Sequence, residues 1–103
     1  MLFRKILLIS LLLIFSNLAL ADSKMELGLE VFNNKARCGA CHALQAAGTK
    51  GDIGPNLDQL KPQKEILITT VANGIGVMPA FEDILTKKEI EAVAYYVFKS
   101  TNK

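Results

Sequence analysis

The sequence predicts a small all-α domain with three main helices joined by Gly-rich loops. Three segments carry apolar residues at helical spacing, and they span approximately residues 23–34, 62–73 and 86–100. The segments between them are rich in glycine and proline, which favour turns and loops. No stretch alternates apolar and polar residues over the roughly four to eight positions that predict a strand.

The first predicted helix begins at Ser23, whose side chain can cap it. Glu26, three residues later, completes a capping box. Leu27 and Val31 then recur at helical spacing, and the pattern ends at about Asn34. This helix leads directly into the only two cysteines and the only histidine of the chain.

The second and third predicted helices also have clear ends. The second takes Pro62 as its first residue, because proline suits that position, and stops at Asn73-Gly74. The third begins at Thr86, where Glu89 completes another capping box, and runs to about Ser100. Both carry apolar residues near one face, as packed helices do.

Residues 38–42 read Cys-Gly-Ala-Cys-His, which is the attachment pattern of a c-type haem. Two thiols separated by two residues can reach the two vinyl groups on one edge of a porphyrin. The histidine that follows supplies an imidazole to the iron. The sequence therefore predicts one covalently bound haem c, with thioether bonds at Cys38 and Cys41.

Three other interpretations of this pentapeptide explain less. A structural zinc site usually has four protein ligands, whereas Cys38, Cys41 and His42 supply only three. A thioredoxin-like dithiol needs a βαβ pattern, but this motif follows a predicted helix and precedes a Gly-rich loop. A plain disulfide leaves the adjacent histidine unexplained.

The first 21 residues are predicted to form a secretory signal peptide. Arg4 and Lys5 supply its positive start, residues 6–15 form a nearly unbroken apolar run, and Ala19-Leu20-Ala21 fits a cleavage site. The run is shorter than the roughly 20 apolar residues that a membrane-spanning helix needs. We expect cleavage and a periplasmic location, and an uncleaved anchor is the alternative.

Residues 22–103 then form one mature domain of 82 residues. The full chain has 12 Lys and Arg residues and ten Asp and Glu residues, so loss of Arg4 and Lys5 leaves ten of each. This balance provides no dense basic patch for nucleic acid. A domain this small usually needs additional stabilisation from a metal or from disulfides, and we expect the covalently bound haem to supply it.

Two Gly-rich loops separate the helices. Residues 43–56 contain Gly48, Gly51 and Gly54 followed by Pro55, so this segment cannot be helical throughout. The second loop, residues 73–81, carries Met78 directly before a proline that stiffens the backbone. We therefore expect Met78 to be presented from a loop.

With these features the chain resembles a class I cytochrome c over nearly all of residues 24–101. The resemblance implies a small cytochrome c fold wrapped around one covalently bound haem, with the first and last helices crossing closely at a glycine. It rests on Gly28 and Phe32 in the first helix, residues 38–42, Gly54-Pro55-Asn56-Leu57, Met78-Pro79, and Val93 with Tyr96 in the last helix.

The resemblance also implies the roles of individual residues. His42 is the proximal axial ligand of the iron and Met78 the distal one, and the carbonyl of Pro55 accepts the other imidazole proton of His42. A methionine thioether favours reduced iron, so this ligand pair raises the reduction potential. The residues alone leave Met78 open as an ordinary core methionine and Pro55 as a simple turn proline.

An iron with both axial positions filled can exchange an electron but has no vacant site for a substrate. We therefore expect a monohaem electron carrier, not an enzyme, that docks transiently with redox proteins and is a monomer by itself. Lys35, Arg37 and Lys50 flank the motif and could supply a positive docking ring or simply be solvated.

Two other functions remain open. One is a haem enzyme or gas sensor in which Met78 is not a ligand and the sixth position is free. The other is the cytochrome subunit of a larger oxidoreductase, because residues 51–60 and the short loop before Met78 resemble cytochrome subunits of sulfite dehydrogenases.

Overall fold

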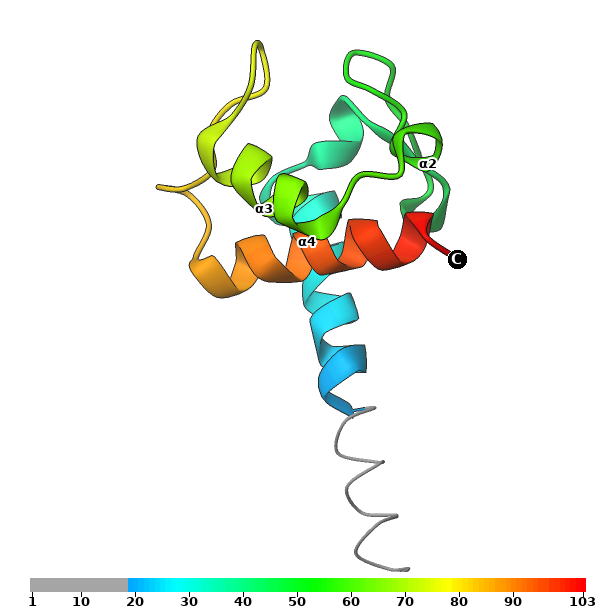
Figure 1. Ribbon diagram of the computed structural model, residues 1–103, viewed down its shortest axis with the longest axis vertical. Helices are drawn as coiled ribbons and strands as arrows, with labels where there is room; N and C mark the ends of the chain where they lie inside the picture. Colours follow the sequence, from blue (N-terminus) through cyan, green and yellow to red (C-terminus); the bar gives the residue numbers. More distant parts are fainter. Residues whose placement is uncertain (1–18) are drawn as a thin grey trace, which may run out of the picture.

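The computed structural model describes residues 19–103, so the predicted leader, apart from residues 19–21, lies outside the described residues. Three long helical segments make up the fold (Figure 1). Helix α3 (Lys64–Asn73) packs along α4 (Lys87–Thr101), and the N-terminal helix crosses α4 near its middle. The predicted helical class is confirmed.

The N-terminal helix is α-helical over residues 19–30 and continues as a π-helical turn, η1 (Val31–Lys35). Its end is close to the predicted one at Asn34, but the predicted start is wrong, because Ser23 lies inside the helix. Ala19, Leu20 and Ala21 are strong helix formers, so in the uncleaved chain the helix extends through the local capping pattern.

The predicted start of α3 is wrong by two residues, whereas its predicted end is confirmed. Lys61 adopts a left-handed conformation with φ of 48°, and Gln63 is extended and occupies the N-cap position without a capping bond from its side chain. Pro62 therefore lies in the turn before α3, and the first helical residue is Lys64. Gly74, with φ of 73°, ends the helix after Asn73.

Helix α4 begins as predicted. The Thr86 hydroxyl accepts a hydrogen bond from the Glu89 amide at 3.1 Å, and the Glu89 carboxylate accepts one from the Thr86 amide at 2.9 Å. This reciprocal pair is the predicted capping box. The helix ends at Thr101, one residue beyond the predicted end.

The segment between the N-terminal helix and α3 contains short elements that the sequence did not predict. Strands β1 (Ala43–Leu44) and β2 (Thr49–Lys50) pair in antiparallel register, with Leu44 opposite Thr49. Two-residue strands are too short to produce an alternating pattern. The other unpredicted elements are the 3₁₀ turns η2 (Cys38–Ala40) and η3 (Gln45–Ala47) and the short helix α2 (Leu57–Leu60).

The core lies where the three long helices meet. At the crossing, a Cβ on Gly28 would lie under 3.0 Å from the Ala92 carbonyl and from the Tyr96 Cβ, so only glycine lets the helices approach this closely. The predicted contact of Gly28 with Tyr96 is confirmed, and Ala92 takes the place expected for Val93. Buried apolar residues around the crossing include Val31, Phe32, Leu44, Leu67, Val71, Ile90, Val93 and Val97.

Candidate functional site

The pentapeptide 38–42 forms a tight turn directly after the N-terminal helix. Arg37 has a left-handed φ of 52° and redirects the chain, after which η2 begins. The amides of Cys41 and His42 both donate to the carbonyl of Cys38, at 3.1 and 2.9 Å. One short turn therefore carries both thiols and the imidazole.

Both cysteines are free thiols and half-buried. Burial raises the pKa of Cys38 to about 11, and the nearby Cys41 adds to the rise. Before its sulfur is bonded to another group, Cys38 is therefore a neutral thiol at neutral pH.

The imidazole of His42 has a defined orientation. Its Nδ1 lies 2.8 Å from the carbonyl oxygen of Pro55. Because a carbonyl can only accept, Nδ1 carries the proton and donates it to Pro55. The lone pair of Nε2 then remains for a metal ion. This contact is the one that the family resemblance implies for Pro55.

Two glycines allow the following loop to lie directly against the pentapeptide. A Cβ on Gly54 would lie 2.8 Å from Nδ1 of His42, and one on Gly51 would lie 2.6 Å from the carbonyl carbon of Cys41. Both distances are shorter than Cβ atoms tolerate. The Gly54 amide also donates to the Cys41 carbonyl at 2.8 Å. Residues 51–55 therefore form a cradle of backbone around His42.

Further side-chain contacts at the site were not found by sequence reasoning. Thr49 bonds to the backbone of His42 and Leu44, and Asp58 accepts a hydrogen bond from the Gln45 amide at 2.8 Å. Asn56 caps α2 through a bond from the Gln59 amide at 3.2 Å. Only Asn56 had a usable signal, because asparagine is a preferred helix cap.

Met78 is presented from a loop, as predicted. Its amide donates to the Ile75 carbonyl at 2.9 Å, and the Ile75 amide donates back at 3.1 Å, which closes a narrow turn containing Gly76 with φ of 57°. The side chain is half-buried and packs against the core. This loop and the one carrying Gly54 project from the same end of the molecule (Figure 1).

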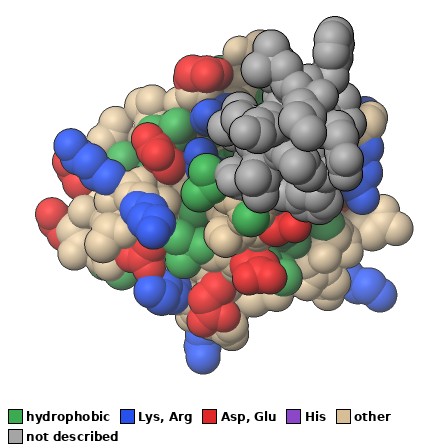
Figure 2. Space-filling model, turned by 90° about the horizontal axis from the view of Figure 1, so that it is seen from below, with side chains coloured by type: hydrophobic (Ala, Val, Ile, Leu, Met, Phe, Trp, Pro, Cys, Tyr) green, Lys and Arg blue, Asp and Glu red, His purple; other side chains and the backbone are tan. Residues whose placement is uncertain are grey.

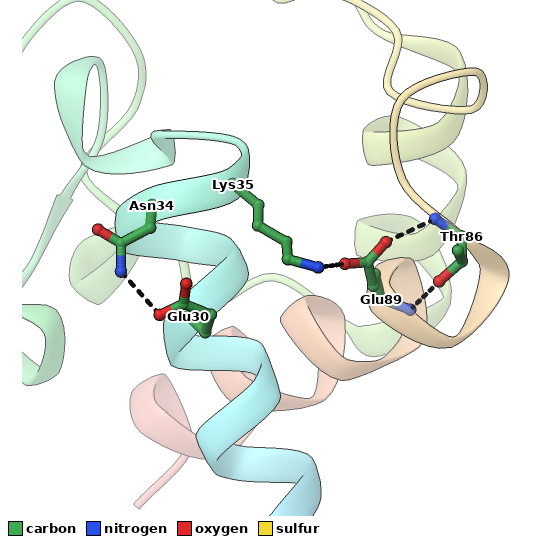
Figure 3. A network of polar contacts seen from close by, with 5 residues as sticks. All are labelled: Glu30, Asn34, Lys35, Thr86 and Glu89. Atoms are coloured by element: carbon green, nitrogen blue, oxygen red, sulfur yellow. Dashed lines mark hydrogen bonds and ion pairs between the residues drawn. The ribbon is translucent and has the colours of Figure 1, made fainter.

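Lys35 is engaged in a network with α4 (Figure 3). Its ammonium forms an ion pair and hydrogen bond with the carboxylate of Glu89, which also belongs to the capping box with Thr86. The bond to Glu89 raises the pKa of Lys35, and the bond from Lys35 lowers the pKa of Glu89. Lys35 is therefore an intramolecular partner of Glu89, which weakens its predicted docking role. Arg37 and Lys50, the other two residues predicted for that role, are exposed.

These residues fit a c-type haem. The donor set comprises two unbonded thiols, an imidazole with Nδ1 already satisfied, and a thioether on a loop. The backbone cradle of Gly51 and Gly54 leaves the imidazole no freedom to tilt toward it. Exposed aliphatic side chains on the two loops, Ile53, Ile75 and Val77, add apolar surface next to these groups.

Comparisons with known proteins agree with this chemistry. Residues 23–97 match the family described as cytochrome C oxidase, cbb3-type, subunit III. Cytochrome c6 of Bryopsis maxima is 37% identical over 86 residues, which cover 77% of this chain and 94% of that protein. Chloroplastic cytochrome c6 of Chlamydomonas reinhardtii is 36% identical over 100 residues, or 87% of this chain, and the match spans 64% of that relative's length.

A solved structure is also similar. The crystal structure of the c-type cytochrome SorU from Sinorhizobium meliloti superposes with a TM-score of 0.73 at 50% sequence identity, covering 80% of this chain and 95% of SorU. Within residues 19–103, no helix combines the length and the apolar character needed to cross a membrane.

Proposed function

The chain belongs to the class I c-type cytochromes, whose members carry covalently bound haem c, and from this premise we propose that it is an exported monohaem electron carrier. In this proposal Cys38 and Cys41 form the thioether bonds, His42 is the proximal ligand, and Met78 is the distal ligand. Bound haem supplies one-electron transfer between ferric and ferrous iron.

The observation that carries the proposal is the orientation of His42. The hydrogen bond from Nδ1 to Pro55 O supports a ring that uses Nδ1 as a donor and presents Nε2 as the metal-binding atom. Such a partner to a ligating histidine fixes the ring and increases its basicity. The two free thiols in the same turn support attachment of the porphyrin at the same place.

The assignment of Met78 is supported by its loop. The narrow turn closed by Ile75 and the bonds from the Phe81 and Glu82 amides to the carbonyls of Val71 and Ala72 give this loop a defined course. A thioether on such a loop suits an axial ligand that must stay in one place. Met25, in the N-terminal helix, packs against the core and serves as the comparison residue.

Replacement of Met78 by alanine tests the ligand assignment. We expect wild-type protein to be low-spin, to show a weak sulfur-to-ferric-iron charge-transfer band, and not to bind carbon monoxide when reduced. The Met78→Ala variant should lose the band and bind carbon monoxide, because the sixth position is then open. Met25→Ala should retain the wild-type spectrum.

A wild-type protein that binds carbon monoxide readily, with a spectrum unchanged by Met78→Ala, would instead support a haem enzyme or gas sensor. Export is a further part of the proposal, supported by the leader pattern of residues 1–21. N-terminal sequencing of the haem-loaded protein tests it, and the expected first residue is Asp22.

A second candidate is the cytochrome subunit of a larger oxidoreductase. The resemblance of residues 51–60 to cytochrome subunits of sulfite dehydrogenases favours it. Affinity purification of the tagged protein from its own cells distinguishes the two. A free carrier should elute alone, whereas a subunit should elute with a catalytic chain in constant proportion.

A further inference from the structure

Thr49, the first residue of β2, bonds to the end of the pentapeptide 38–42. Its Oγ1 accepts a hydrogen bond from the Leu44 amide at 3.1 Å. The same oxygen lies 2.9 Å from the carbonyl of His42 and 3.5 Å from that of Leu44. A hydroxyl has one proton to donate, and the shorter distance assigns it to His42. Thr49 thus holds the peptide group that joins His42 to Ala43.

The rest of the Thr49 side chain contacts the other part of the pentapeptide. A Cβ on Gly39 would lie under 3.0 Å from both Cβ and Cγ2 of Thr49. Position 39 therefore cannot carry a side chain unless Thr49 or the turn moves. The pairing of β1 with β2, which places Leu44 opposite Thr49, keeps the side chain in this position.

No other side chain in residues 19–103 makes a hydrogen bond to the backbone of residues 38–42. Pro55 and Gly54 act through backbone atoms, on the ring of His42 and on the carbonyl of Cys41. Thr49 is thus the side chain that joins the start of the pentapeptide, at Gly39, to its end, at His42.

We propose that Thr49 is a positioning residue for haem binding, which sets the course of the peptide from Gly39 to His42 and thereby the plane of the His42 imidazole. The inference rests on the proposed function, because it concerns His42 as an iron ligand. The hydroxyl sets the ligand orientation, and the methyl group requires glycine at position 39.

The test uses haem-loaded mature protein in which Thr49 is replaced by valine. Valine keeps the branched shape but removes the hydroxyl, so the His42 carbonyl and the Leu44 amide lose their partner. The hyperfine-shifted proton resonances of the haem methyl groups in the ferric protein report the orientation of the axial ligands, including the plane of the imidazole. We expect Thr49→Val to change the spread of these shifts, and Thr49→Ser, which keeps the hydroxyl, to preserve it.

Thr101→Val is the matched control, because its hydroxyl also donates to a backbone carbonyl, that of Val97 at 2.8 Å, but in α4. It should lower the melting temperature without moving the haem methyl shifts. The proposal is overturned if Thr49→Val has the wild-type shifts or if Thr101→Val changes them equally.

A second measurement covers the case in which Thr49→Val does not yield loaded protein. Gly39→Ala should reduce the yield of haem-loaded protein severalfold. Adding Thr49→Ser should recover part of that yield, because it removes Cγ2, the atom that would lie closest to the new methyl group, and leaves Cβ at 2.9 Å. A wild-type yield of Gly39→Ala, or no recovery in the double variant, overturns the inference. Wild-type protein that remains colourless beside an active maturation system overturns the proposed function itself.

Discussion

At the scale of single residues, the absence of a side chain is as important to this site as the ligands are. Gly51 and Gly54 let a backbone segment approach the pentapeptide and the imidazole to distances that no Cβ would tolerate. Only then can Pro55 place its carbonyl 2.8 Å from Nδ1 of His42. The orientation of the His42 imidazole thus depends on the absence of a Cβ atom at Gly51 and at Gly54.

We predict that Gly54→Ala lowers the yield of haem-loaded protein and alters its spectrum. The new methyl group would overlap the His42 ring, so either the ring or the loop must move and the bond to Pro55 O is lost. The measurement is haem absorbance per mole of purified chain, together with the haem methyl shifts of the ferric protein.

Gly48→Ala is the control for this substitution. Gly48 has φ of 71°, so alanine carries a backbone cost of about 1 kcal/mol, but its methyl group would meet no atom. This variant should melt at a lower temperature and keep the wild-type spectrum. Equal spectra for Gly54→Ala and wild type would show that the cradle does not orient the imidazole.

At the scale of elements, one carboxylate connects two helices. Glu89 closes the capping box that starts α4 and also pairs with Lys35 in the last turn before the pentapeptide (Figure 3). The π-helical turn η1 lies at this point, and such turns often occur next to functional sites. The network therefore ties the segment leading into Cys38 to the start of the last helix.

The pair predicts a pH window for stability. Glu89 has a pKa below its ordinary value of 4.5, so its contribution is present above that value and is lost as the pH falls through the lowered pKa. Lys35 has a pKa above 10.5, so its contribution is present below that value and is lost as the pH rises through the raised pKa.

Glu89→Gln should therefore lower the melting temperature most between about pH 5 and pH 10, with the difference shrinking outside this window. Glutamine can still complete the capping box, so the substitution mainly removes the charge. Thermal melts of haem-loaded protein across the pH range measure the difference in melting temperature between this variant and the wild type. Glu91→Gln, at an exposed position of the same helix, is the control. A difference that does not vary with pH would contradict the assignment to the ion pair.

At the scale of the whole molecule, residues 22–103 are few and carry equal numbers of acidic and basic side chains. Acidic and basic side chains are interspersed over the face seen in Figure 2, as ten charges of each sign in residues 22–103 would suggest. Its core is a single cluster at the crossing of three helices. A domain of 82 residues buries a modest share of its surface and usually needs additional cross-links.

We predict that the mature chain without haem is largely unfolded at 25 °C. Thioether bonds and axial ligands would connect residues 38–42 to the loop of Met78, and without them the exposed aliphatic side chains on both loops remain in water. Circular dichroism of the Cys38→Ala/Cys41→Ala variant, compared with haem-loaded wild type, tests this. A cooperative melt of the haem-free variant resembling that of the loaded protein would contradict the prediction.

Sequence features that span only a few residues predicted the cofactor, two helix ends and the class of the fold. The pentapeptide 38–42 indicated the cofactor, Thr86 and Glu89 located the start of α4, and Asn73-Gly74 located the end of α3. Each is a local pattern, in which partners three or four positions apart meet whenever the backbone turns. The class of the fold followed from the same short-range periodicity.

Only the tertiary structure decided which residues meet across longer separations. Helix α3 begins at Lys64 and not at the predicted Pro62, because the left-handed conformation of Lys61 places the proline in a turn. Lys35 pairs with Glu89, which lies 54 positions away in the sequence. Thr49 donates a hydrogen bond to the His42 carbonyl and packs against Gly39. Threonine and glycine are ordinary loop residues with no periodic signal, so their roles arise only where packing brings two backbones within contact distance.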